Sequence, residues 1–168
     1  MLSTSKRLLA GTLLSLASAV AAEVSPVAPP FRFDDLSGQA LSLGTLRGRV
    51  VVLSYWATWC APCKAELAML DRLYRTRHAD GLQVIAVTNE RAVSAARLRS
   101  WTSNLAFPIV LAKPAQDRGY GPIGGILPTI YVIDRAGLIR VRRSGTMPEA
   151  ELVRLLAGLL AEAAPADR

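Results

Sequence analysis

Residues 50–66 read VVVLSYWATWCAPCKAE, and this stretch decides the fold. Val50–Tyr55 is an apolar run that is rich in β-branched residues and too short for a helix, which predicts a fully buried strand. Pro62 suits the first turn of a helix. From there apolar residues recur at intervals of three and four until Gly81, which predicts a long amphipathic helix. The stretch therefore predicts a buried strand that leads directly into a helix.

Cys60 and Cys63 are the only cysteines of the chain and lie at this junction. The spacing puts Cys60 at the helix N-terminus and Cys63 one turn inside, with Cβ atoms about 5–6 Å apart. Small adjustments bring such a pair within disulfide geometry. The helix dipole favours a thiolate at Cys60, so we expect its pKa to lie below the usual ~8.5. Cys63, buried behind it, is expected to keep a higher pKa and to react second.

Three kinds of site fit such a pair. A structural zinc site needs four ligands, whereas the chain adds a single histidine, His78, more than four turns away, which we interpret as a solvated residue. A purely structural disulfide would close almost no loop and would contribute little stability. The spacing favours a redox-active pair, which requires no metal or organic cofactor.

Strands and helices alternate on both sides of this junction. Upstream, Phe31–Leu46 shows short apolar–polar alternation around Ser37-Gly38, which predicts a β-hairpin. Downstream, the patterns predict strands at Leu82–Val87, Phe107–Leu111, Thr129–Ile133 and Leu138–Arg142, helices at Ala92–Ser103 and from Pro148 onward, and a loop at Gly119–Gly125. This order predicts an α/β domain whose central mixed β-sheet is covered on both faces and flanked by helices.

The N-terminus has the composition of an export signal. Two basic residues precede an apolar run over Leu8–Val20, and small residues follow at Ala21 and Ala22. The run is shorter than the ~20 apolar residues of a spanning helix, and an uncleaved N-terminal anchor is the alternative. We expect a signal peptide at 1–22, a Pro-rich lead-in at 23–30 and one domain at 31–163.

The basic charge is spread rather than concentrated. The formal net charge of +7 becomes +5 after the two charges of the signal segment, Lys6 and Arg7, are subtracted. Only Arg140, Arg142 and Arg143 cluster, and strand alternation places Arg140 and Arg142 on one face. Nucleic-acid binding calls for a basic stripe that contains aromatic residues. The pattern therefore predicts a solvated surface and no nucleic-acid partner.

Residues 51–66 resemble the active-site segment of the TlpA/ResA/DsbE-like thioredoxins, a family of periplasmic or membrane-tethered thiol–disulfide oxidoreductases. The resemblance covers about Phe31–Leu160, because Asp35–Gly38 is similar to the family's N-terminal hairpin and Leu127–Thr129 and Ile133–Gly137 to its later landmarks. It implies a thioredoxin-like fold with an N-terminal β-hairpin extension, and a monomer that acts on protein disulfides or thiols.

The resemblance also implies roles for individual residues. Cys60 attacks a substrate disulfide, and Cys63 resolves the mixed disulfide. Pro128 is a cis-proline that faces the disulfide, where the Leu127 backbone can pair with an extended substrate. Glu66 matches an acidic residue one turn beyond the second cysteine, where it can raise that thiol's pKa and relay its proton. A solvated surface carboxylate is the alternative for Glu66.

The remaining expectations concern the rim and two departures from the family pattern. The predicted substrate contacts are Trp59, Ala61, Pro62, Leu127 and Pro128. Trp56 is expected in the core. Ser54 stands where many thioredoxins carry a buried Asp and this subfamily often Asn, which leaves Glu66 to handle protons alone. Ala68 replaces a helix-kinking Pro, so we expect a straighter helix.

By the same resemblance, the expected function is that of a periplasmic reductant in cytochrome c maturation or a similar assembly, recharged by a membrane or periplasmic thiol redox partner. An oxidant role stays open, because this fold supports potentials from about −270 to about −120 mV. A binding or chaperone module that holds partners around Trp59 and Leu127 is one alternative. A thiol peroxidase is the other, although it needs Pro-x-x-x-Thr-x-x-Cys and Thr58 lies only two residues before Cys60.

Overall fold

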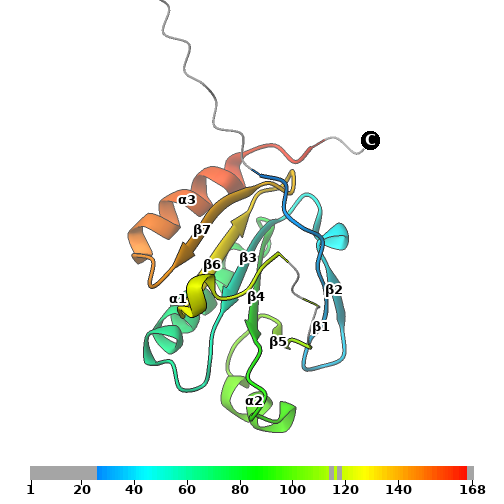
Figure 1. The fold of residues 1–168 in the computed structure, drawn as a ribbon. Coiled ribbons are helices and arrows are strands. Elements are labelled where there is room, and N and C mark those ends of the chain that lie inside the picture. The colour runs from blue at the N-terminus through cyan, green and yellow to red at the C-terminus, as the bar shows by residue number, and fades with distance from the viewer. Residues whose placement is uncertain (1–25, 114–115, 117–118, 166–168) are drawn as a thin grey trace, which may run out of the picture.

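A five-stranded mixed sheet forms the centre of the computed structural model, which describes residues 26–113, 116 and 119–165 (Figure 1). Its strands are β3 (Val50–Tyr55), β4 (Leu82–Thr88), β5 (Ile109–Leu111), β6 (Thr129–Ile133) and β7 (Ile139–Ser144). They lie in the order β5-β4-β3-β6-β7. The β3–β4 and β4–β5 pairs are parallel, whereas the β3–β6 and β6–β7 pairs are antiparallel. The predicted mixed sheet is confirmed, and the predicted signal segment lies outside the described residues.

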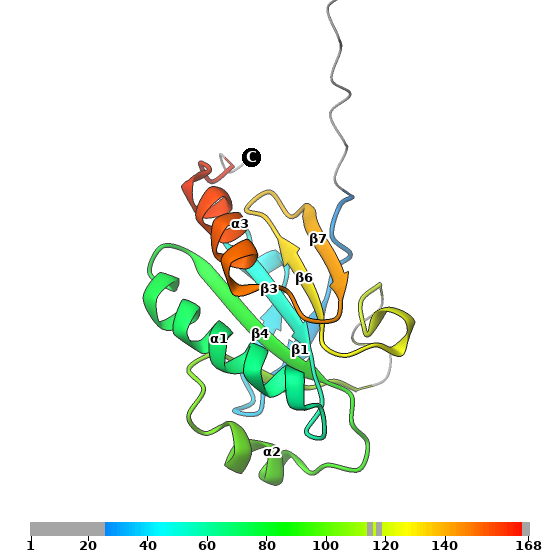
Figure 2. The ribbon, with the colours of Figure 1, turned by 90° about the vertical axis from the view of Figure 1, so that its left-hand side faces the viewer.

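The α-helices of the described chain cover one face of this sheet, and a hairpin covers the other (Figures 1 and 2). They are α1 (Ala61–Arg77), α2 (Ala95–Thr102) and α3 (Glu149–Ala161). Two short 3-10 helices, η1 (Gly44–Leu46) and η2 (Ile123–Gly125), contribute residues to the core on the hairpin side. The buried residues of the α-helices form one core cluster with alternate residues of the central strands. The intervening strand residues, which point the opposite way, form a second cluster with the hairpin. Two-sided burial explains why the central strands are apolar at nearly every position.

The N-terminal hairpin was predicted and is confirmed. It consists of β1 (Arg32–Asp34) and β2 (Ala40–Ser42), which pair antiparallel. In the turn, Asp35 Oδ1 accepts hydrogen bonds from the Ser37 N–H at 2.8 Å and the Ser37 hydroxyl at 2.6 Å. Gly38 has a φ of 90°, a conformation that favours glycine. The turn residues therefore stabilise the hairpin through local contacts.

His78 was expected to be a solvated residue, and this expectation is wrong. It lies at the C-terminal end of α1, half-buried, with its ring centroid 4.5 Å from that of Tyr74. Its Nδ1 lies 3.1 Å from the Leu82 carbonyl oxygen. The cause is the turn at Gly81, which has a φ of 101° and returns the chain at once into β4. His78 is thus part of the packing between the helix and the sheet.

Several element boundaries differ slightly from those predicted. The helix expected over 92–103 begins at Ala95, because the Ser94 hydroxyl caps it by accepting a hydrogen bond from the Arg97 N–H at 3.2 Å. α1 continues through Ala68 as one helix, without the proline that usually interrupts it. Residues 26–28 lie along β7, where the Ile139 N–H donates to the Pro26 carbonyl at 2.9 Å. Among the described helices, none is long and apolar enough to cross a bilayer.

Candidate active site

The cysteine pair lies at the junction of β3 and α1, as predicted. Five residues separate Tyr55 from Ala61 and carry Cys60 to the N-cap position of α1. Cys60 and Cys63 form a disulfide with their Cα atoms 5.3 Å apart. The Cys63 N–H donates to Cys60 Sγ, with 3.3 Å between nitrogen and sulfur. In the reduced protein we expect the same N–H and the helix dipole to stabilise a thiolate at Cys60.

The two sulfurs differ in their access to solvent. Cys63 is fully buried, with an exposed fraction of 0%, whereas Cys60 keeps 4%. Trp59, directly before the pair, is 71% exposed, and Ala61 and Pro62 are exposed as well. Both cysteines are thus buried, and the exposed surface next to the pair is the rim formed by Trp59, Ala61 and Pro62.

The bond between Leu127 and Pro128 is cis, as the resemblance implies. β6 begins directly after Pro128, and its first residue, Thr129, lies opposite Tyr55 at the end of β3. Pro128 therefore lies at the sheet edge where the chain leaves β3 towards Cys60. Pro128 is buried and Leu127 is half-buried. The structure thus brings the two predicted contact segments to the same edge of the sheet.

Glu66 is buried, with an exposed fraction of 5%, so its interpretation as a solvated surface carboxylate is wrong. The Ser54 hydroxyl donates to Glu66 Oε1 at 2.8 Å, and Oε2 has no hydrogen-bond partner among the described residues. Burial raises the pKa of Glu66 above the usual 4.5, and the Ser54 hydrogen bond opposes this effect in part. Because Glu66 follows Cys63 by three positions and both are buried, the two share one face of α1. A carboxyl group that holds its proton to higher pH thus lies one turn from the buried thiol.

Two further residues of the site escaped the sequence-based reasoning. Ser54 was read only as the loss of an acidic residue, although it is the hydroxyl partner of Glu66. It is the one serine in a strand that is otherwise apolar or aromatic. Because a buried hydroxyl requires a hydrogen-bond partner, a serine at such a position signals a polar neighbour. Glu90 binds Thr58 in the loop before Cys60. No local pattern connects two residues that lie 32 positions apart.

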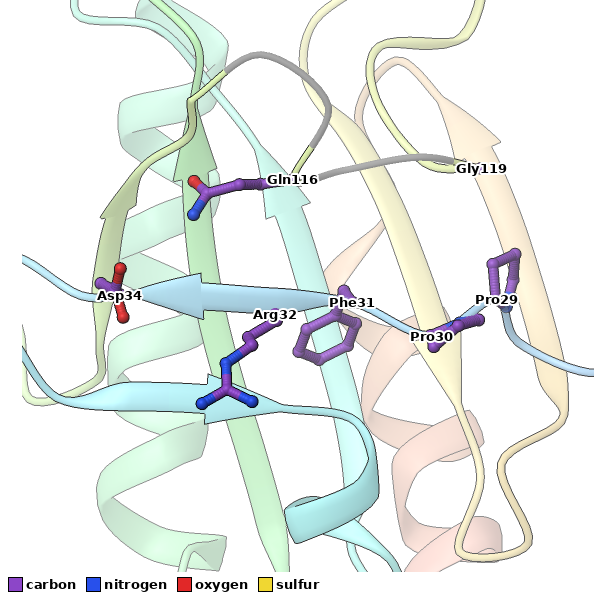
Figure 3. Close-up of a pocket in the computed structure, with 7 residues that line it drawn as sticks. All are labelled: Pro29, Pro30, Phe31, Arg32, Asp34, Gln116 and Gly119. Carbon is purple, nitrogen blue, oxygen red and sulfur yellow. The ribbon is translucent and has the colours of Figure 1, made fainter.

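A cavity of about 860 Å³ lies elsewhere on the molecule (Figure 3). It is lined by Pro29–Arg32, Asp34, Gln116 and Gly119. These residues belong to β1 and neighbouring loops, and β1 covers the face of the sheet opposite α1 (Figure 3). The cysteines pack into the cluster on the helical face. The cavity is therefore separate from the disulfide site.

The buried carboxyl of Glu66 predicts a pH-dependent contribution to stability. The pKa is raised in the folded protein, so this contribution is fully present below about pH 4.5, the usual value. It is lost as the pH rises through the folded-state pKa, and a difference of one pH unit between the folded and unfolded pKa values corresponds to about 1.4 kcal/mol. Relative to wild type, Glu66→Gln should therefore gain stability as the pH rises above 4.5. Denaturant unfolding of the oxidised protein across this range measures the effect.

Glu149→Gln is the matched control for this prediction, since Glu149 is exposed at the start of α3 and pairs with Arg72 on the surface. It should follow the wild-type pH dependence closely. Parallel curves for wild type and Glu66→Gln would show that Glu66 is ionised as easily in the folded as in the unfolded chain.

Comparison with known proteins agrees with this geometry. The profile of the AhpC/TSA family matches residues 24–142. The thioredoxin-like protein YneN of Bacillus subtilis is 35% identical over 132 residues, which are 77% of this chain and 76% of YneN. The thiol-disulfide oxidoreductase ResA of Geobacillus thermodenitrificans is 32% identical over 133 residues, 79% of this chain and 75% of ResA.

A solved structure shares the fold. The putative thiol:disulfide interchange protein DsbE from Chlorobium tepidum superposes with a TM-score of 0.71 at 25% identity, covering 84% of this chain and 100% of that one. The junction of β3 and α1 holds the Cys60–Cys63 disulfide, a pair with the C-x-x-C spacing that thiol–disulfide exchange can use. The chain therefore belongs to the AhpC/TSA family and, within it, to the thioredoxin-like thiol–disulfide oxidoreductases related to ResA and DsbE.

Proposed function

We propose that this protein is an exported reductant of protein disulfides that works through the Cys60–Cys63 pair. One observation carries the proposal: Cys60 caps α1 beside an exposed rim, whereas Cys63 is sealed beneath it. An attacking sulfur must be reachable and readily ionised, and a resolving sulfur must be kept from external thiols. The two positions meet these separate requirements.

The reaction is a two-electron exchange in two steps. The Cys60 thiolate attacks one sulfur of a substrate disulfide, and the other substrate sulfur leaves as a thiolate that takes up a proton. The Cys63 thiolate then attacks Cys60 Sγ, which breaks the mixed disulfide and releases the second substrate thiol. The substrate gains two electrons, and the protein is left with the Cys60–Cys63 disulfide.

The second step requires Cys63 to lose its proton in a buried place. Glu66 is the ionisable side chain on the same buried face of α1, one turn away. Burial raises its pKa, which brings that pKa closer to the pKa of a thiol than that of an exposed Glu would be. We assign to Glu66 the acceptance of the Cys63 proton, with Ser54 holding the carboxyl group in place.

The proposed location and direction follow from the N-terminal segment and the family resemblance. Residues 1–22 have the order of a secretory signal peptide. Outside the cytoplasm the protein would be recharged by a membrane or periplasmic thiol partner, and would serve cytochrome c maturation or a similar assembly of thiol-containing proteins. Equilibration with glutathione should give a potential near the reducing end of the range known for this fold, about −270 mV. A value near about −120 mV would make the protein an oxidant instead.

Reduction of insulin disulfides tests the function itself. Catalytic turnover with dithiothreitol as electron donor is expected, and it separates an oxidoreductase from a binding or chaperone module. A thiol peroxidase would consume hydrogen peroxide at the expense of the same donor. Binding of unfolded protein without insulin turnover would contradict the proposal.

Selective alkylation tests the assigned order of the cysteines. In the reduced protein near neutral pH, brief iodoacetamide treatment should label Cys60 alone, because its thiolate is stabilised at the helix N-terminus and Cys63 is buried. Mass spectrometry of tryptic peptides locates the label. Preferential modification of Cys63 would reverse the roles.

A further inference from the structure

The loop that carries Cys60 is bound to a carboxylate from another part of the chain. The Thr58 N–H donates to Glu90 Oε2 at 2.5 Å, and the Thr58 hydroxyl donates to Glu90 Oε1 at 2.9 Å. Thr58 is buried and Glu90 is half-buried. Among the described residues Glu90 takes part in no ion pair, and both of its carboxylate oxygens accept hydrogen bonds from Thr58.

Strand pairing explains how these residues meet. β3 and β4 are parallel, with Tyr55 opposite Val87, so the segments that follow both strands leave the sheet at the same edge. The two segments are joined there by a hydrogen bond of 3.0 Å from the Trp56 N–H to the Val87 carbonyl. The Glu90 N–H donates to the Thr88 hydroxyl at 3.3 Å, which directs its side chain back towards the loop.

Thr58 in turn controls the position of Cys60. The Cys60 N–H donates to the Ala57 carbonyl at 3.0 Å, so Ala57–Cys60 forms a tight turn with Thr58 inside it. Fixing both the N–H and the hydroxyl of Thr58 fixes this turn against β4. It thereby keeps Cys60 Sγ near the Cys63 N–H that stabilises the thiolate.

We propose that Glu90 is a positioning residue that preserves the N-cap geometry of Cys60 when the disulfide is open. In the oxidised protein the S–S bond itself ties Cys60 to α1. In the dithiol that bond is absent, and the turn depends on hydrogen bonds. Because the Glu90–Thr58 hydrogen bonds hold the same geometry that the disulfide requires, they stabilise the disulfide more than the looser dithiol, and by thermodynamic linkage they lower the reduction potential.

Two variants test the proposal by different chemistry. Glu90→Gln keeps one acceptor oxygen and removes the negative charge, whereas Thr58→Val removes the hydroxyl donor and leaves the charge in place. Both should shift the glutathione equilibrium towards the dithiol. For Glu90→Gln we expect a shift of about tenfold, which corresponds to about +30 mV for this two-electron couple, and for Thr58→Val a smaller shift of the same sign. Thr58→Ser, which keeps both donors, should restore the wild-type potential.

Unfolding of the reduced and oxidised forms completes the thermodynamic cycle that links their stabilities to the glutathione equilibrium. The oxidised form of each variant should lose more stability than the reduced form, by the amount that the redox equilibrium shifts. Equal losses in both forms with an unchanged potential would show a purely structural role and overturn the proposal. A shift of Glu90→Gln towards the dithiol, with no effect of Thr58→Val, would show that only the charge of Glu90 matters, and would overturn it as well.

The inference rests on the proposed role of Cys60, yet the two can fail separately. The glutathione equilibrium and the unfolding measurements need no protein substrate and no assigned direction of electron flow. Absence of insulin turnover in the wild type would contradict the proposed function alone. Glu151→Gln, on the distant α3, controls for the loss of a surface charge, since Glu151 pairs with Arg143.

Discussion

Cys63→Ser is expected to convert this oxidoreductase into a trap for its substrates. Cys60 stays at the N-cap of α1 and still attacks, but no buried thiol remains to break the mixed disulfide. Multiple turnover of insulin should be lost, and covalent adducts with substrate proteins should accumulate. Non-reducing gels of cells that carry this variant would show the adducts, and mass spectrometry would identify the captured chains.

Cys60→Ser is the matched control, because it also leaves a single thiol. That thiol is Cys63, whose exposed fraction is 0% in the folded protein. We expect no adducts and no turnover from this variant. Adducts with Cys60→Ser and none with Cys63→Ser would reverse the order of attack and refute the mechanism.

Glu66→Gln is expected to slow resolution strongly and first attack little. A positioned acid–base group contributes typically about 10²–10⁴-fold, so resolution should slow by roughly tenfold or more. The first attack, measured in the Cys63→Ser background, needs no proton from Cys63 and should stay close to the wild-type rate. Because an ionised Glu66 opposes a second anion nearby, its removal should also lower the pKa of Cys63. Thiolate absorbance during pH titration measures this pKa.

Ser54→Ala tests the same carboxyl group by removing its hydrogen-bond donor. The Ser54 hydrogen bond lowers the pKa of Glu66, so its removal should raise that pKa further and move the pH profile of turnover upward. Burial of the carboxyl is unchanged, and the fold should remain intact. If Glu66→Gln and Ser54→Ala both leave titration and turnover unaffected, Glu66 has no part in the proton transfer.

The position of the cysteines could be predicted because local rules determine it. An apolar run of strand length, a following proline and the spacing of the cysteines place Cys60 at a helix start, and the structure has it there. Alternation within a strand correctly placed Arg140 and Arg142 on one exposed face. Trp56 was expected in the core and is buried. Each of these predictions depends on neighbouring residues and on the period of one element.

The cis bond before Pro128 has a different basis. Only ~5–6% of bonds before proline are cis in folded proteins, so the local sequence alone does not predict this one. The resemblance to a family predicted it, and the structure confirms it. The covering of the sheet was predicted only in outline, because periodicity identifies an apolar face without saying which face of the sheet that helix will cover. The described α-helices lie on one face, and the hairpin covers the other.

The sequence by itself thus determined the class of fold, the junction of strand and helix, and the reactive pair at that junction. The tertiary structure alone decided which residues from other parts of the chain lie around the pair and its loop. Glu66 meets Ser54 across 12 positions, and Glu90 meets Thr58 across 32. Such contacts depend on strand register and on which strand ends lie side by side. Both are set by packing of the whole domain rather than by neighbouring residues in the sequence.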